Sequence, residues 1–271
     1  MAERAYAEVV GDPIAHSKSP LIHRFWLDAL GLEGDYRATR VEADGLSAYF
    51  AERRADPNWR GCNVTVPHKL ATLDHVGDPG GVRGTIGAVN TVFRGEGGAL
   101  VGTNTDAAGF YAPLSGFDLA GRPVAVVGAG GAARAVLFAL SRIGVGPVAI
   151  LNRNPLKAAA LLSAFGLKGQ AFPLSAPLPP ARLLVNASVL GMEGRPPLDL
   201  DLSALPPDAI VYDLVYAPLV TDLVAQAQDR GLEVVDGLEM LVAQAALAFE
   251  LFFGREPPRE RDDELRKLLL A

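Results

Sequence analysis

Hydroxyl, amide and charged side chains gather in four short segments of the first half of the chain, each where a strand is expected to meet a loop. These segments are His16–Pro20, Asn63–Lys69, Ala88–Thr91 and Gly102–Asp106. Ligands of open α/β sheets bind beside the carboxyl ends of the strands, so the four segments are expected to face one site. Any one of these residues more often caps a helix or forms a turn, but clustering in four successive loops favours a ligand.

The residue types in these segments suit a small molecule with several hydroxyl groups and one anionic group. Ser17 and Ser19 precede an expected helix N-terminus, which favours a carboxylate or a phosphate. The side chains that could hydrogen-bond to hydroxyl groups are Asn63, Thr65, Asn90 and Asp106. A site of this kind rejects analogues that lack those hydroxyls, because its own polar groups would be left unpaired.

Lys69 is the best candidate for proton transfer. It is expected in the first turn of a helix that Pro67 opens, where the positive end of the helix dipole disfavours a cation. That placement asks for an explanation, and Asp106 could supply the counter-charge. A Lys–Asp pair can hold an ammonium group in place to protonate a carbonyl oxygen as a hydride arrives at the carbon.

A glycine cluster in the middle of the chain indicates a dinucleotide. The apolar run Val124–Val127 is followed by Gly128, Ala129, Gly130, Gly131, Ala132 and Ala133, which fits the pattern G-x-G-x-x-G/A. In that pattern the first glycine makes the tight turn, the second lets the backbone approach the pyrophosphate, and the third small residue permits close helix–strand packing. The alternative interpretation is a tight turn that serves packing alone.

The next strand predicts which dinucleotide is bound. About 20 residues beyond the glycines, an NAD enzyme carries an acidic residue that holds the ribose 2′-hydroxyl. Here the strand ends in Asn152, Arg153 and Asn154, with Lys157 one turn later. No carboxylate would repel a 2′-phosphate, and arginine can bind one bidentately, so the sequence predicts NADP. The alternative is that Arg153 is a solvated surface charge.

The elements that must position these residues form two alternations of strand and helix. The first has strands at 5–10, 35–41 and 59–66, a helix that starts at Ser19 with serine as its N-cap, a helix at 44–55 capped by Asp44, and a hairpin formed by 86–94 and 99–103. This pattern predicts a mostly parallel α/β domain over residues 1–104.

The second alternation predicts a Rossmann-type domain over residues 105–238. After a helix at 105–116, strands are expected at 123–127, 147–151, 169–172, 183–186, 209–213 and 232–235, with helices after the glycines and at 155–165. Helices at 238–253 and 259–270 complete the chain, and periodicity does not decide which domain they join. The predicted fold class is α/β, with a cleft between the two domains.

Composition excludes several classes of protein. The 271 residues carry a formal net charge of −6, which disfavours a general nucleic-acid binder. The single cysteine, Cys62, allows no internal disulfide, the N-terminus lacks the pattern of a secretory signal, and no apolar run reaches the ~18 residues of a spanning helix. The four histidines match no metal-binding spacing. We therefore expect a soluble, cytoplasmic protein with a small-molecule substrate and no metal.

Taken together, the motifs resemble the shikimate dehydrogenase family. The segments that carry the resemblance are GDPIAHSKSPLIH, NVTVPHK, GAVNT, GTNTD, GAGGAAR, NRN, NASVLGM, YDLVYAPLVTDL and DGLEMLVAQAALAFELFFG, which run in order from Gly11 to Gly254. The resemblance implies NADPH-dependent reduction of 3-dehydroshikimate to shikimate, a step of chorismate and aromatic amino-acid biosynthesis. It also implies that residues 239–271 pack back on the first domain. The sequence departs from the family's common pattern at Arg24 and His68, which touch none of the proposed chemistry.

The resemblance also assigns roles by motif. The implied catalytic pair is Lys69 and Asp106. The implied substrate-binding residues are Ser17, Ser19, Asn63, Thr65, Lys69, Asn90, Asp106, Tyr216 and Gln244. The implied cofactor-binding residues are Gly128, Ala129, Gly130, Gly131 and Ala132 for the pyrophosphate, Asn152, Arg153, Asn154 and Lys157 for the 2′-phosphate, and Leu214, Gly237 and Met240 for the nicotinamide pocket.

Three alternatives stay open. A quinate or dual quinate/shikimate dehydrogenase would share the catalytic pair but often favours NAD, which the residues after the second Rossmann strand argue against. A homologue of the amidohydroquinate pathway would have a modified polyol site, which the intact hydroxyl and amide residues disfavour. A non-catalytic ligand-sensing homologue could lose Lys69 or Asp106, and both are present. The apolar C-terminal helix could support a homodimer, but no pattern specifies an interface.

Overall fold

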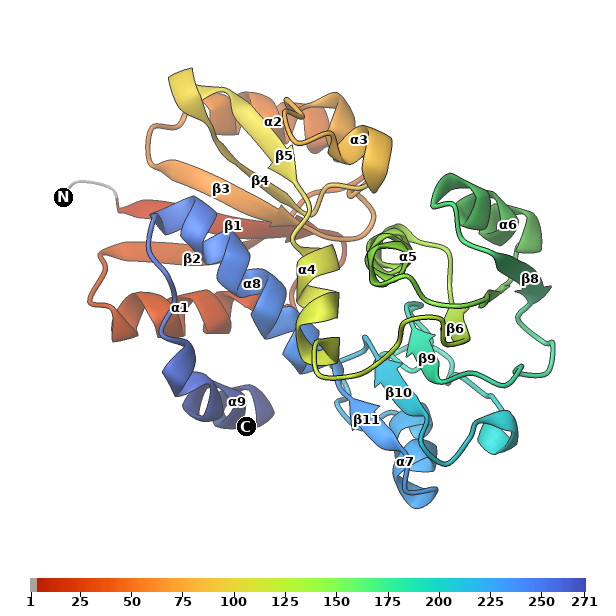
Figure 1. The fold of residues 1–271 in the computed structure, drawn as a ribbon. Coiled ribbons are helices and arrows are strands. Elements are labelled where there is room, and N and C mark those ends of the chain that lie inside the picture. The colour runs from red at the N-terminus through yellow and green to blue at the C-terminus, as the bar shows by residue number, and fades with distance from the viewer. Residues whose placement is uncertain (1–3) are drawn as a thin grey trace. The chain divides into compact units, whose positions relative to one another are not determined.

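The computed structural model describes residues 4–271 and divides into two compact units. The first unit comprises Met1–Thr105, of which residues 4 onward are described, together with Val242–Ala271, and the second comprises Asp106–Leu241. The expected boundaries, after residues 104 and 238, lie close to these. Each unit contains its own sheet (Figure 1).

The first unit is built on a five-stranded sheet in the order β2-β1-β3-β4-β5. Its strands are β1 (Ala5–Gly11), β2 (Gly34–Arg40), β3 (Trp59–Val64), β4 (Thr91–Arg94) and β5 (Leu100–Thr103). β1 pairs in parallel with β2 and β3, whereas β4 is antiparallel to both β3 and β5. Every strand except β4 therefore runs in one direction. The carboxyl ends of β1, β3 and β5 share an edge with the beginning of β4.

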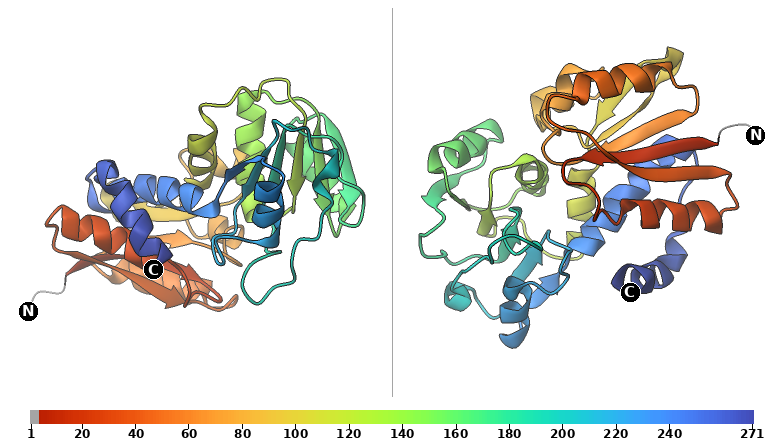
Figure 2. Two further views of the ribbon diagram at one scale, coloured as in Figure 1. Left: turned by 90° about the horizontal axis from the view of Figure 1, so that it is seen from below. Right: turned by 180° about the vertical axis from the view of Figure 1, so that it is seen from behind.

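Helices belong to this unit, and two of them, α8 and α9, come from the end of the chain. The helices are α1 (Ser19–Ala29), α2 (Leu46–Ala55), α3 (Val82–Thr85), α8 (Gly237–Phe253), α9 (Asp262–Leu270) and the 3-10 helices Ala71–Asp74, Glu96–Gly98 and Arg259–Arg261. Ala248 and Phe252 of α8 pack in one buried cluster with Ala7, Val9 and Tyr36 of the sheet. Figures 1 and 2 show this part of α8 lying across the sheet. Packing thus decides the placement of the C-terminal helix that periodicity left open.

Three local expectations for the first unit are wrong. Ser19 is the first residue of α1 and not its N-cap, which is Lys18. The residue before α2 is Gly45 rather than Asp44, and neither helix has a side-chain cap. No helix begins at Pro67. The N–H of His68 instead donates to the carbonyl of Thr65 at 2.9 Å, and residues 66–70 form a turn. Lys69 therefore lies in a turn, and the helix-dipole argument for its placement does not hold.

The second unit is an entirely parallel six-stranded sheet in the order β11-β10-β9-β6-β7-β8. Its strands are β6 (Val124–Val127), β7 (Val148–Asn152), β8 (Gly169–Pro173), β9 (Leu183–Asn186), β10 (Ile210–Asp213) and β11 (Glu233–Val235). Its helices are α4 (Asp106–Tyr111), α5 (Gly131–Ile143), α6 (Pro155–Ala164) and α7 (Asp222–Asp229), with 3-10 turns at Ala112–Leu114 and Leu202–Ala204. This is the predicted Rossmann-type arrangement, apart from α7, which was not predicted.

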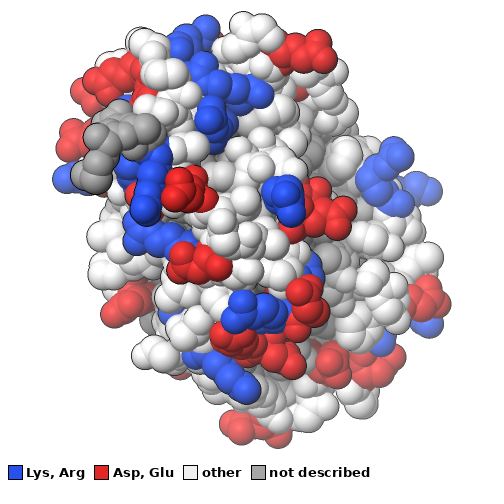
Figure 3. All heavy atoms as spheres, turned by 90° about the vertical axis from the view of Figure 1, so that its left-hand side faces the viewer, with Lys and Arg blue, Asp and Glu red and all other residues white. Residues whose placement is uncertain are grey.

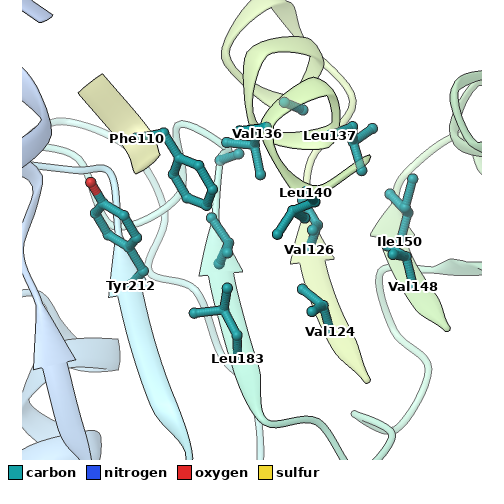
Figure 4. Packing of buried hydrophobic residues seen from close by; sticks show 14 of the residues in the cluster. Phe110, Val124, Val126, Val136, Leu137, Leu140, Val148, Ile150, Leu183 and Tyr212 are labelled. Carbon is teal, nitrogen blue, oxygen red and sulfur yellow. The ribbon is translucent and has the colours of Figure 1, made fainter. Parts of the chain in front are cut away.

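The core of the second unit fixes α5 against the central strands. Figure 4 shows Val136 and Leu140 of α5 packed over Val124 and Val126 of β6. Phe110 of α4 stacks on Tyr212 of β10, with ring centroids 5.0 Å apart. Because these side chains are fully or almost fully buried, the start of α5 is held in place beside the end of β6.

His23 is buried in an aromatic cluster of the first unit. Its ring stacks on Tyr36 with centroids 3.9 Å apart and also neighbours Trp26 and Phe249. Within residues 4–271 neither ring nitrogen has a hydrogen-bond partner. Burial lowers the pKa of His23 from 6.5 to about 3, because the apolar surroundings disfavour the charged form. The folded protein therefore holds a neutral imidazole here.

This burial makes stability depend on pH. The unfolded chain protonates His23 below its ordinary pKa of 6.5 while the folded chain does not, so acid favours unfolding until about pH 3. Between about pH 7 and pH 5 we expect His23 to account for a loss of about 2 kcal/mol in the free energy of unfolding. Urea unfolding of the wild type and of His23→Phe should show a flatter pH dependence in the variant. The same substitution at the exposed His16 provides the control. Equal slopes of unfolding free energy against pH for wild type and His23→Phe would contradict the prediction.

Two further observations concern the distribution of charge on the surface and the hydropathy of the helices. On the face shown in Figure 3, Lys and Arg side chains lie interspersed with Asp and Glu. Across the part of the chain that the structure describes, no helix is both long enough and apolar enough to cross a membrane.

Candidate active site

Backbone hydrogen bonds bring the polar segments of the first unit to one edge of its sheet. Thr65 N–H donates to the carbonyl of Val10 at 2.9 Å, which joins the end of β3 to the end of β1. The carbonyl of Asn90 accepts from Val64 N–H at 2.7 Å, and Asn90 N–H donates to Thr103 at 3.2 Å. The predicted segments around Asn63, Asn90 and Asp106 therefore meet at the carboxyl edge, where α/β sheets bind ligands.

The amide of Asn90 is the centre of a buried network at this edge. Its Oδ1 accepts from the backbone N–H of Thr105 at 2.7 Å and from the Thr91 hydroxyl at 3.1 Å. Its Nδ2 donates to Thr105 Oγ1 at 2.9 Å and to Gln244 Oε1 at 3.4 Å. Gln244 lies 154 positions further along the chain and is brought here by α8. Thr91 and Thr105 were not among the predicted site residues, although they lie inside the motifs GAVNT and GTNTD.

Asn63 and Thr65 follow one another along the end of β3. Asn63 is buried, accepts a hydrogen bond from the Tyr36 hydroxyl at 2.6 Å, and donates from Nδ2 to Thr91 Oγ1 at 3.1 Å. Thr65 is half-buried beyond the strand. Asn63 thus joins the Asn90 network directly through Thr91, and Thr65 lies two residues further along the chain.

The two serines lie in the loop after β1 and at the start of α1. Ser19 is buried, Ser17 is half-buried, and the N–H of Ser19 donates to Ser17 Oγ at 3.3 Å. Between them, Lys18 donates from Nζ to the carbonyl of Leu269 at 2.5 Å, near the end of α9. Helix α9 therefore anchors the serine turn, and a cation at the last carbonyls of a helix is a favourable placement.

Lys69 and Asp106 are carried by different segments of the chain. Lys69 is half-buried, and its carbonyl accepts from Val89 N–H at 2.7 Å, which ties its turn to the segment that carries Asn90. Asp106 is buried, begins α4 and follows Thr105 directly. Tyr216 lies in the second unit, half-buried in the loop after β10.

The glycine turn of the second unit has the geometry that a pyrophosphate requires. Gly128 has a φ of +107°, and a Cβ there would lie 2.8 Å from the carbonyl oxygen of Ala187, so glycine is needed. At Gly130 a Cβ would meet no atom of residues 4–271 within 4 Å, so the N-terminus of α5 is open to a ligand. Ala133, the third small position, is fully buried against the sheet. The residues present fit a dinucleotide.

The predicted 2′-phosphate residues lie on the neighbouring strand. Gly128 N–H donates to the carbonyl of Leu151 at 2.9 Å, so the ends of β6 and β7 are adjacent. Arg153 is exposed just beyond β7. Asn154 caps α6 by accepting from the N–H of Lys157 at 3.1 Å, and Asn152 donates to the carbonyl of Asn154 at 2.9 Å. Asn152 and Asn154 thus shape the turn that presents Arg153.

The residues predicted for the nicotinamide pocket also lie together. A Cβ at Gly237 would lie 2.6 Å from the carbonyl oxygens of both Leu214 and Val215, so only glycine allows this close approach. Met240 is buried in the core cluster against which Leu214 packs. Leu214, Gly237 and Met240 are therefore neighbours at the ends of β10 and β11.

A buried polar network, whose members were not predicted to have a role, orders the loop that carries Leu214 and Tyr216. Asp213 accepts from Asn186 Nδ2 at 2.9 Å and from Thr221 Oγ1 at 2.6 Å. Burial raises the pKa of Asp213 above its usual value, while the hydrogen bonds from Thr221, Val215 and Asn186 oppose that rise. These network residues do lie inside the family motifs: Asn186 is in NASVLGM, and Asp213 and Thr221 are in YDLVYAPLVTDL.

The remaining candidate groups form no metal site in the described part of the chain, where no three His, Cys, Asp or Glu residues gather. His68 is buried with Nε2 at 2.6 Å from the carbonyl oxygen of Val41. Cys62 is buried in β3, and burial raises the pKa of its thiol well above the usual range.

Comparison with known proteins identifies the family. Residues 9–92 match the model of the shikimate dehydrogenase substrate binding domain, and residues 237–262 match that of the shikimate 5'-dehydrogenase C-terminal domain. A shikimate dehydrogenase (NADP(+)) of Sphingopyxis alaskensis is 71% identical over 266 residues, which cover 98% of this chain and 97% of the relative. The chain belongs to the shikimate dehydrogenase family.

Solved structures of similar proteins show the same fold. The shikimate 5-dehydrogenase of Thermus thermophilus, in complex with NADP(H) and shikimate, is 42% identical with a TM-score of 0.85, and the match covers 98% of this chain and all of that one. The 5-ketofructose reductase of a Gluconobacter species is 30% identical with a TM-score of 0.86, and the match covers 99% of this chain and all of that one. The predicted family and fold class are thereby confirmed. Because a reductase of another substrate shares the shikimate dehydrogenase fold, the site residues must decide the substrate.

Proposed function

We propose that this protein catalyses the reversible NADPH-dependent reduction of 3-dehydroshikimate to shikimate, in the biosynthesis of chorismate and the aromatic amino acids. The observation that carries the proposal is the 71% identity, over nearly the whole chain, to a shikimate dehydrogenase (NADP(+)). The buried hydroxyl and amide network around Asn90 supports it, because such a site suits a substrate with several hydroxyl groups.

We assign substrate binding to residues 1–104 with 239–271 and cofactor binding to residues 105–238. Ser17 and Ser19 hold the substrate carboxylate. The hydroxyl groups are bound by Asn63, Thr65, Asn90, Asp106 and Gln244, and we assign Lys69 and Tyr216 to substrate binding as well. The network that joins Asn63, Asn90 and Gln244 supports this assignment, because it presents their amides from one edge of the sheet.

The proposed cofactor, NADP, uses the carboxyl edge of the second sheet. The N–H groups of the turn Gly128–Ala132 hold the pyrophosphate at the start of α5. Asn152, Arg153, Asn154 and Lys157 hold the 2′-phosphate, and Leu214, Gly237 and Met240 line the nicotinamide pocket. The open space at Gly130 and the absence of a carboxylate at positions 152–154 support this choice of dinucleotide.

The proposed mechanism needs one proton donor and one group that positions it. When held by the residues named above, NADPH would supply the hydride for the ketone carbon. The Lys69 ammonium donates a proton to the carbonyl oxygen, so the ketone becomes a secondary alcohol and Lys69 is left neutral until it recovers a proton from solvent. The Asp106 carboxylate holds the Lys69 ammonium and accepts a hydrogen bond from a neighbouring substrate hydroxyl. In the reverse direction, neutral Lys69 removes the hydroxyl proton.

A spectrophotometric assay tests the proposal. The purified protein should reduce NADP⁺ when shikimate is added, and quinate with NAD⁺ should give much slower turnover. Comparable turnover of quinate would favour a dual quinate/shikimate dehydrogenase. A folded protein that binds shikimate without reducing NADP⁺ would instead be a ligand-sensing homologue, and no response to shikimate at all would refute the assignment.

We further propose a cytoplasmic location, which the single cysteine supports because it permits no internal disulfide. We propose no nucleic-acid partner, in keeping with the net charge of −6. A homodimer stays a prediction from the apolar C-terminal helix.

A further inference from the structure

A buried tyrosine outside the predicted site makes a direct hydrogen bond to one of the proposed substrate ligands. The Tyr36 hydroxyl donates to Oδ1 of Asn63 at 2.6 Å, and both side chains are buried. Tyr36 is on β2 and Asn63 on β3, with β1 between them, so the tyrosine reaches across a whole strand. The small side chain of Ala7, the register partner of Tyr36 on β1, leaves room for the ring.

The ring of Tyr36 is clamped, so its hydroxyl has a fixed position. One face stacks on His23 at a centroid distance of 3.9 Å and an interplanar angle of 5°. Phe252 of α8 lies tilted beside it at 6.4 Å, and Ala7 and Val9 of β1 complete the buried cluster. A buried ring held on several sides does not change rotamer freely.

The direction of this hydrogen bond fixes the orientation of the Asn63 amide. Burial raises the pKa of Tyr36 well above its usual range, so the phenol keeps its proton and donates it. Oδ1 of Asn63 is the acceptor, and Nδ2 must therefore face the other way. That nitrogen donates to Thr91 Oγ1 at 3.1 Å and lies at a long 3.5 Å from the carbonyl oxygen of Asn90. Asn63 thus presents an N–H donor, not a carbonyl, toward the Asn90 network.

We propose that Tyr36 is a positioning residue for the substrate: its hydroxyl holds the Asn63 amide so that Nδ2 points its second hydrogen at a substrate hydroxyl. This inference rests on the proposed function. Without the phenol the amide can rotate, and in the rotated form the site would offer an acceptor where the substrate expects a donor. Tyr36 acts only through Asn63 and touches neither the substrate nor the cofactor.

A pair of tyrosine variants separates positioning from stability. Tyr49 is a second buried tyrosine of the same unit, and its hydroxyl donates to Glu8 Oε1 at 2.7 Å, away from the proposed ligands. Tyr36→Phe and Tyr49→Phe each remove a buried, hydrogen-bonded hydroxyl group, so both should lower the melting temperature. Only Tyr36→Phe should raise KM for shikimate, by about 3- to 10-fold, with kcat and KM for NADP⁺ unchanged.

Calorimetric titration of shikimate into the cofactor-free protein gives a readout independent of turnover, and Kd should rise with KM in Tyr36→Phe alone. In an Asn63→Ala background, the Tyr36→Phe change should raise KM and Kd for shikimate by less than about twofold, because there is no amide left to orient. Equal KM and Kd values for the two tyrosine variants, or full additivity with Asn63→Ala, would overturn the inference. A wild-type protein that fails to oxidise shikimate would instead refute the proposed function.

Discussion

Replacing Lys69 with alanine should lower kcat by about 10²- to 10⁴-fold while the protein stays folded, because the alkoxide that forms at the ketone oxygen loses its proton donor. Lys69 is half-buried in the turn after β3, and its carbonyl is bound by Val89 N–H, so the backbone of that turn does not depend on the ammonium group. KM for shikimate should also rise, since Lys69 is one of the proposed substrate-binding residues. KM for NADP⁺ should not change, because the cofactor is assigned to the other unit.

Two further variants make this result specific. Lys168, exposed before β8 and away from the carboxyl edge, provides the matched control, and Lys168→Ala should keep full turnover. Lys69→Arg retains the positive charge, but a guanidinium does not release its proton near neutral pH, so this variant should remain slow. Steady-state kinetics with circular dichroism on each variant measures both effects. Near-normal kcat in Lys69→Ala, or full recovery in Lys69→Arg, would show that Lys69 is not the general acid.

Local sequence patterns predicted most of the strands but not every helix. Buried parallel strands such as Val124–Val127 read as short apolar runs between turn residues, and the structure confirms them. The helix Asp222–Asp229 was missed because it has only eight residues, too few to show a repeated helical pattern around its buried Leu223, Val224 and Ala227. Its start was nevertheless readable, since Thr221 accepts from Val224 N–H as an N-cap.

The Pro67 segment shows where a local signal misleads. Proline at the first position of a helix and proline in a turn look alike in sequence. In this chain a hydrogen bond from His68 N–H to the Thr65 carbonyl closes a turn, and the next helical segment, Ala71–Asp74, is a single 3-10 turn. Lys69 was therefore chosen for a physical reason that does not hold, and its proposed role depends on the motif and on the segment that it adjoins.

The parts of the site that local patterns could not predict are those made by distant residues. Gln244 meets Asn90 only because α8 packs on the first sheet, and helical periodicity shows an apolar face without naming the surface that it covers. Tyr36 looks like an ordinary core residue of β2, since the sequence does not show which strand lies two positions away in the sheet. Family resemblance implied that the C-terminal helices pack on the first domain and that Gln244 binds the substrate, whereas only the structure shows the contact between Tyr36 and Asn63.

Replacing Arg153 with alanine should raise KM for NADP⁺ by about 10- to 100-fold, the loss expected when a hydrogen-bonded charge pair with the 2′-phosphate is removed. Arg153 is exposed just after β7, next to the glycine turn, and its side chain is not needed for the turn that Asn152 and Asn154 form. KM for NAD⁺ should stay the same, because NAD⁺ has no 2′-phosphate for the guanidinium to bind. The ratio of the two KM values is therefore the measurement that isolates Arg153.

Arg142 offers the matched control for this experiment. It is an exposed arginine in the last turn of α5, at the opposite end of the helix whose N-terminus is proposed to face the pyrophosphate. Arg142→Ala removes the same charge from the same unit and should leave both KM values unchanged, which excludes a general electrostatic effect. An unchanged KM for NADP⁺ in Arg153→Ala would mean that Arg153 is a solvated surface charge. An equal rise for NAD⁺ would mean that it binds a part shared by both dinucleotides, and the preference for NADP would then depend on Lys157 and on the absence of a carboxylate after β7.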